Sequence, residues 1–91
     1  MELELEQPKV RGETHMVFVV VPRFNLGTLV NMIETMRIAN YLSSQKSFSW
    51  EVISFDSARV MASSGIAVSV STDTENVASA DYICVLASWG A

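Results

Sequence analysis

The chain has 91 residues, of which 49% are hydrophobic, and its six basic and ten acidic residues give a net charge of −4. This balance argues against a nucleic-acid-binding surface, because phosphate contacts need clustered positive charge. The single cysteine excludes an internal disulfide and a cysteine-based metal site. No apolar run is long enough to cross a bilayer, and the acidic start M-E-L-E-L-E is unlike a signal peptide, so we expect a cytoplasmic protein without membrane contact.

Residues 1–15 predict an N-terminal tail. Four glutamates, a proline and a glycine interrupt any helical periodicity in this segment. Leu3 and Leu5 alternate with glutamates, which leaves a short edge strand as the alternative. His15 is the only histidine and has no cysteine or second histidine as a co-ligand. We therefore interpret it as a surface residue ahead of the first strand rather than as a metal ligand.

Residues 16–42 organise the rest of the chain. Residues 17–21 are apolar and mostly β-branched, which is typical of a strand buried on both faces. Pro22 ends this strand because it has no backbone N–H to donate. Asn25 is the predicted N-cap of a helix over residues 26–42. A buried strand that turns directly into a helix is the first half of a βαβ unit, in which ligands gather at the carboxyl ends of the strands.

The predicted helix has apolar residues on more than one side. One stripe at helical spacing is widened by further apolar positions, so we expect the sheet on one side and another element or a partner subunit on the other. Arg37 and Asn40 fall near the stripe, and two roles stay open for them: a binding role, or a snorkelling arginine and a helix-end asparagine. Gly27 suits a close backbone approach. The stripe comprises Leu26, Leu29, Val30, Ile33 and Met36, widened by Met32, Ala39 and Leu42.

The second half of the chain predicts further strands. A second main strand is expected over residues 50–55, and residues 59–61 and 66–71 form a hairpin, since apolar and small polar residues alternate in the latter. Thr72 and Glu75 fit a capping box that opens a short helix over residues 74–79. Residues 82–86 repeat the buried-strand pattern.

These elements give an α/β fold in the order β-α-β-hairpin-α-β, a partial doubly wound (flavodoxin-like) parallel sheet. The available helices would cover one face of the sheet well and the other poorly. The chain is therefore expected either to be part of a larger domain or to assemble with another copy.

Several motifs in order resemble the N-terminal part of GlxA-type regulators of the AraC family. In that family the first strand is followed by Pro-Gly-Phe-Ser and by a helix with Arg-x-Ala-Asn-x-Leu, which residues 37–42 match. The next family motif is Tyr-x-Trp-x-x-x-Ser-x-Asp-Gly, which this sequence matches at Trp50, Ser54 and Asp56. Residues 63–65, Ser-Ser-Gly, then precede an alternating strand as they do in the family.

The resemblance implies that residues 16–91 form the first half of a class I glutamine amidotransferase-like (PfpI-like) sensor domain. It also implies a sensor that responds to small amino-acid-like or quaternary-amine metabolites. We expect a homo-oligomer because the sheet is incomplete, and we expect no enzyme activity and no cofactor because no nucleophile falls within the chain. DNA would be bound only through a C-terminal helix-turn-helix module that this chain does not contain.

The expected ligand site lies where two loops leave the carboxyl ends of neighbouring strands. Its aromatic residues, Phe24 and Trp89, could face a cation, or they could pack in the core or at a dimer contact. The six expected ligand-binding residues are Phe24, Asn25, Thr28, Ser88, Trp89 and Gly90.

Two alternatives remain open. The first is a fragment of a PfpI-like hydrolase or amidase, but Thr28 stands where those enzymes carry an acidic residue, and their nucleophilic cysteine would lie beyond Ala91. Cys84 is no substitute, because it falls within a predicted buried strand without an adjacent base. The second alternative is an interaction module that dimerises without a ligand.

Overall fold

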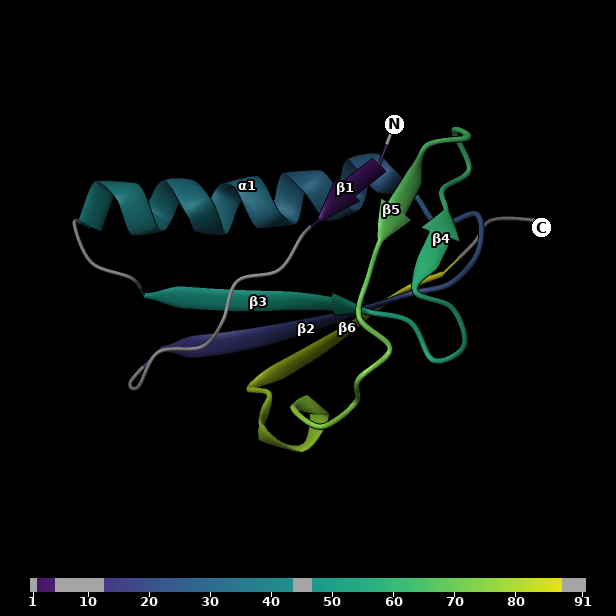
Figure 1. Cartoon of the computed structure of the whole chain (residues 1–91). Coiled ribbons are helices and arrows are strands. Elements are labelled where there is room, and N and C mark those ends of the chain that lie inside the picture. Colours follow the sequence, from purple (N-terminus) through teal and green to yellow (C-terminus); the bar gives the residue numbers. More distant parts are fainter. Residues whose placement is uncertain (1, 5–12, 44–46, 88–91) are drawn as a thin grey trace.

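A three-stranded parallel sheet with β2 at its centre dominates the computed structural model (Figure 1). The structure describes residues 2–4, 13–43 and 47–87. Strand β2 lies between β3 and β6, so the sheet order is second, first and third main strand, as in the start of a flavodoxin-like fold. The elements are β1 (Glu2–Glu4), β2 (Thr14–Val20), α1 (Leu26–Ser43), β3 (Phe48–Ile53), β4 (Arg59–Met61), β5 (Ala67–Ser69), the 3₁₀ turn η1 (Val77–Ser79) and β6 (Tyr82–Leu86).

Pairing on both sides explains why β2 is apolar throughout its second half. Phe18 is in register with Val52 on β3 and with Cys84 on β6, and the preceding and following residues point to the opposite face. The predicted strand over residues 17–21 is thus confirmed as a central strand. It begins earlier than predicted, since Thr14 already pairs with Phe48.

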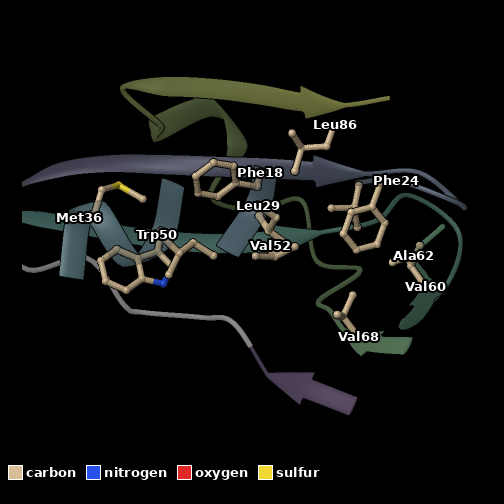
Figure 2. Packing of buried hydrophobic residues seen from close by; sticks show 12 residues of the cluster. Phe18, Phe24, Leu29, Met36, Trp50, Val52, Val60, Ala62, Val68 and Leu86 are labelled. Atoms are coloured by element: carbon tan, nitrogen blue, oxygen red, sulfur yellow. The ribbon is translucent and has the colours of Figure 1, made fainter. Parts of the chain in front are cut away.

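Helix α1 covers one face of this sheet. Asn25 caps it as predicted, because the Thr28 N–H donates to Asn25 Oδ1 at 3.0 Å. Leu29, Ile33 and Met36 are its buried residues and belong to the main core, and Figure 2 shows Leu29 and Met36 on the side of the helix that faces the sheet. Across from them lie side chains of the sheet, including Phe18, Trp50, Val52 and Leu86.

The opposite face of the sheet has a thinner cover. Val17, Val19 and Ile53 form a second, smaller cluster against Val77 and Ala80, which belong to the η1 region. On the same face, β6 leaves Ile83 and Val85 about half exposed or more. The uneven cover predicted for the two faces is therefore present in the described part of the chain.

A second small sheet contains the predicted hairpin. Strands β4 and β5 are antiparallel, with Val60 opposite Val68. Strand β1 pairs in parallel with the other edge of β5, so Glu2–Glu4 adopts the edge strand that the sequence left as an alternative to a tail. Val60 and Val68 are buried and join the main core, which links the hairpin to the end of β2.

Three predictions about local structure need correction. Strand β3 spans Phe48–Ile53 rather than residues 50–55, because Ser54 begins a turn and its Oγ accepts the N–H groups of Asp56 and Ser57 at 3.4 Å. Strand β6 is not buried like β2: it is an edge strand in the described structure.

The predicted helix over residues 74–79 is reduced to the single turn η1. The capping box does not form, because the Glu75 N–H donates to Asp73 Oδ1 at 2.9 Å and the Asp73 N–H donates to Ser71 Oγ at 3.0 Å. These local side-chain turns compete with the helical pattern.

Candidate functional site

The turn between β2 and α1 lies at the carboxyl end of the central strand. The Phe24 N–H donates to the Val21 carbonyl at 3.1 Å, which closes a four-residue turn with Pro22 in its second position. Arg23, in the third position, has φ of 72°. A proline followed by a residue with positive φ is the arrangement of a type II turn.

The hairpin holds this turn in place from the side. The Arg23 N–H donates to the Met61 carbonyl at 2.7 Å, and the Ser63 N–H donates to the Phe24 carbonyl at 2.9 Å. Because the backbone of the turn is hydrogen-bonded to Met61 in β4 and to Ser63, two residues after that strand, the start of α1 has a fixed position relative to the end of the sheet.

Arg23 occupies a backbone conformation that favours glycine. We expect Arg23→Gly to raise the free energy of unfolding by about 0.5–1 kcal/mol, because relief of the left-handed conformation outweighs the added freedom of the unfolded chain. Urea denaturation followed by circular dichroism measures this difference. Arg23→Ala is the matched control: it removes the same cation but keeps the strain, so it should leave stability within about 0.5 kcal/mol. A destabilised glycine variant would contradict the prediction.

The structure separates the predicted site residues into three groups. Phe24 has no exposed surface and packs in the main core near Val60 and Ala62 (Figure 2), which is the alternative role considered for it. Asn25 and Thr28 are exposed at the rim of the sheet, with the Asn25 side chain engaged as the helix cap. The other three predicted residues, Ser88, Trp89 and Gly90, lie outside the described residues.

The strand arrangement brings the ends of β2 and β6, the strands that precede the two expected loops, to one edge. Val20 is in register with Leu86, so these two strands end side by side. On the other side of β2, the chain after β3 forms the turn that Ser54 stabilises, where Ser54 Oγ also donates to Asp56 Oδ1 at 3.2 Å. Within the described structure, the candidate site is thus an exposed rim built by the ends of three parallel strands.

Residues 37 and 40 of α1 have structural contacts rather than contacts at this rim. Asn40 Nδ2 donates to the Phe48 carbonyl at 2.9 Å, and Asn40 Oδ1 accepts the N–H groups of Ser47 and Phe48 at 2.8 and 2.9 Å. Arg37 is exposed and donates to Glu34 at 2.8 Å. The helix-end role considered for Asn40 is therefore correct, and it fixes where β3 begins.

His15 is not a surface residue, contrary to the prediction. It is buried on β2, with Nδ1 2.6 Å from Ser49 Oγ and Nε2 3.7 Å from Glu51 Oε2. The His15 N–H also donates to Asp81 at 2.7 Å, and Glu51 accepts a hydrogen bond from Asn76 at 3.3 Å. The sequence contained a signal for this cluster: His15, Ser49 and Glu51 occupy alternate positions that share one face when the strands pair in register.

The buried cluster has the groups of a hydrolytic triad but not its accessibility. Ser49 has no exposed surface, so a substrate cannot reach its hydroxyl. Cys84 is a free, half-buried cysteine that packs against the core on the helix side of the sheet, whereas His15 belongs to the opposite face. The arrangement therefore provides no pairing of this thiol with the histidine as its base.

The described residues contain no group of three or more histidine, cysteine or acidic side chains placed to hold a metal ion. In the same part of the chain, none of the helices is both long and apolar enough to traverse a bilayer.

Comparison with known proteins relates the chain to transcription regulators. No family model matches it. The HTH-type transcriptional regulator GbdR from two strains of Pseudomonas aeruginosa, UCBPP-PA14 and PAO1, is 29% identical over 83 residues, which are 91% of this chain and 23% of the regulator. The chain thus spans about a quarter of its curated relative and is homologous to part of a transcription regulator.

A solved structure supports the same fold. The crystal structure of an AraC family transcriptional regulator from Pseudomonas putida matches with a TM-score of 0.75 and 19% sequence identity. The match covers 85% of this chain and 42% of that chain. The α/β architecture is therefore that of a known regulator, and the solved protein extends well beyond the shared part.

Proposed function

We propose that this chain is the ligand-sensing and self-associating portion of a DNA-binding transcription regulator, with neither DNA binding nor catalysis of its own. The observation that carries the proposal is the homology to a transcription regulator over 91% of the chain. The net charge of −4 supports a role apart from DNA, since it offers no concentrated positive surface for phosphates.

The ligand site proposed for this sensor is the rim at the carboxyl ends of the parallel strands. Asn25 and Thr28 contribute exposed polar groups beside a turn whose backbone is bonded to the hairpin. Phe24 is buried in the core beneath the turn, so its proposed role is to hold the turn in place rather than to contact the ligand. Ser88, Trp89 and Gly90, which follow β6 in the sequence, are proposed to complete the site. The indole ring of Trp89 and neutral polar groups would suit a small amino-acid-like or quaternary-amine metabolite.

A hydrolase of PfpI-like type is less well supported. The acidic residue expected beside a nucleophile is replaced by Thr28, and Cys84 lies on the face of the sheet opposite to His15. The rim is thus better suited to binding a metabolite than to catalysing its hydrolysis.

Ligand titration of the chain tests the proposal. Glycine betaine, carnitine and arginine are added in turn, and the melting temperature is followed; at least one is expected to raise it, because a ligand that binds only the folded state stabilises that state. Thr28→Val, which removes an exposed hydroxyl at the rim, should abolish most of the shift. Thr35→Val is the matched control on the same helix, and it should retain the shift. Absence of a shift with all three compounds, or an equal shift in both variants, would contradict the proposed site.

A further inference from the structure

The side of α1 that faces away from the sheet carries an exposed apolar patch. Ile38, Tyr41 and Leu42 have the i, i+3, i+4 spacing that places side chains on one helical face. Tyr41 is 79% exposed and Leu42 is 73% exposed. The core residues of the same helix, such as Ile33 and Met36, occupy the other side. We call the exposed side the outer face of α1, comprising Gly27, Asn31, Glu34, Ile38, Tyr41 and Leu42.

This outer face differs from the surface of an ordinary covering helix. Among the 18 residues of α1, only Glu34 and Arg37 are charged, and they form an ion pair with each other at 2.8 Å. A solvent-facing helix side normally carries several charges, whereas apolar residues around the whole circumference indicate burial on both sides. Tyrosine and arginine are also enriched where proteins associate.

We propose that the outer face of α1 binds the same face of a second copy of this chain, with the two helices antiparallel across a two-fold axis. A two-fold contact requires a surface that is complementary to itself. With the axis at the level of residues 35 and 36, Glu34 on the outer face of each copy faces Arg37, which lies at the edge of that face one turn before Tyr41, of the other copy. The charges of the helix are therefore complementary to those of an identical helix that runs in the opposite direction.

The sizes of the side chains fit the same arrangement. The bulky residues, Ile38, Tyr41 and Leu42, are near the C-terminal end of α1. The N-terminal part of the outer face carries smaller side chains, those of Gly27 and Asn31, and therefore projects less from the helix; we call it the low part. Among the described residues, a Cβ built on Gly27 would approach only Asn25 Oδ1, at 3.2 Å, so no other described side chain or loop covers it. An antiparallel pair places Tyr41 and Leu42 over this low part, whereas a parallel pair would set Tyr41 against Tyr41 and Glu34 against Glu34.

The length of the helix bounds the strength of the association. Eighteen residues span about 27 Å, so a single helix pair buries less than the roughly 800 Å² per partner of a standard interface. We therefore expect a Kd on the order of micromolar. This inference names the surface for the self-association proposed above, and it rests on that part of the proposal.

Sedimentation equilibrium of the chain over a range of concentrations tests the surface. The wild type should show a monomer–dimer equilibrium, and Tyr41→Glu should raise the Kd by about a hundredfold, because it places two carboxylates within an apolar contact. Phe55→Glu is the matched control, since Phe55 is also an exposed aromatic residue but lies in the turn after β3. It should leave the Kd unchanged. Circular dichroism verifies that each variant is folded.

A charge exchange tests the two-fold pairing itself. Glu34→Arg leaves two positive charges at positions 34 and 37 of each helix, and Arg37→Glu leaves two negative charges there. Each variant alone should therefore have a dimer Kd about tenfold higher than the wild type, because like charges face each other across the axis. An equal mixture of the two should regain the wild-type dimer mass, because each positive helix then faces a negative one. A monomeric wild type would refute self-association altogether. A dimer that Tyr41→Glu leaves intact, an equal effect of Phe55→Glu, or a mixture that stays monomeric would refute this surface while leaving self-association standing.

Discussion

Phe24→Ala is expected to lower the free energy of unfolding by about 3–5 kcal/mol. The ring has no exposed surface and fills the space between the end of β2, Leu29 and the hairpin, so truncation leaves a cavity that the bonded turn cannot close. Small domains are typically stable by only about 5–15 kcal/mol, so this loss is a large share of the total. Urea denaturation followed by circular dichroism measures the change.

Two controls separate core packing from ligand contact at this position. Phe24→Leu keeps most of the buried volume and should cost less than about 2 kcal/mol, with the ligand-induced rise in melting temperature retained. Phe55→Ala removes the same type of ring from an exposed turn and should change stability by less than about 0.5 kcal/mol. If Phe24→Ala were as stable as the wild type, the packing assigned to Phe24 would be wrong.

Asn40→Ala is expected to lower the free energy of unfolding by about 2 kcal/mol. The amide side chain makes three hydrogen bonds of 2.8–2.9 Å to the backbone of Ser47 and Phe48, and their loss leaves two N–H groups and one carbonyl at the start of β3 without these partners. The melting temperature and the urea midpoint should both fall.

The same helix provides the comparison for Asn40. Asn31 is exposed on the outer face of α1, so Asn31→Ala removes an asparagine without removing such a bridge and should change stability by less than about 0.5 kcal/mol. Asn40→Asp keeps an acceptor for the Ser47 and Phe48 N–H groups and loses only the donor, so its cost should fall between those of the two alanine variants. Equal effects at positions 31 and 40 would show that the bridge contributes nothing.

The sequence predicted best the elements whose pattern depends on burial alone. The run over residues 17–21 is apolar without interruption, and only a strand paired on both sides needs such a run. The helix over residues 26–42 was predicted within one residue of its observed end, because Asn25 marks its start and Leu29, Ile33 and Met36 repeat along one side.

Boundaries and roles that depend on other segments were predicted less well. The start of β3 is set by Asn40, eight residues before it, and its end by the hydroxyl of Ser54, which no local periodicity reveals. His15 was misplaced because its burial depends on Ser49 and Glu51, which become its neighbours only when β3 pairs with β2. Strand β6 has the apolar composition of β2, but composition does not show how many neighbours a strand has.

For the candidate site, the sequence predicted that the first and third main strands are neighbours, but not how each described residue between β2 and α1 is used. Strands β2 and β6 do pair, and they end side by side. Phe24 and Asn25 belong to this edge, yet one is packed in the core and the other caps the helix. The sequence pattern of an aromatic residue beside a turn is the same whether the residue packs in the core or contacts a ligand. Only the position of the hairpin residues Val60 and Ala62 distinguishes the two roles.

The central place of β2 has a consequence for how the protein is made. This strand leaves the ribosome before both of its neighbours, and it can pair with β6 only after residue 86 has been synthesised. Until then the edge of β2 that pairs with β6 is unpaired, and it is accessible to other nascent chains or to chaperones, as is usual for non-local parallel pairing. Translation that stalls in the hairpin should therefore produce chains that chaperones retain and proteases degrade.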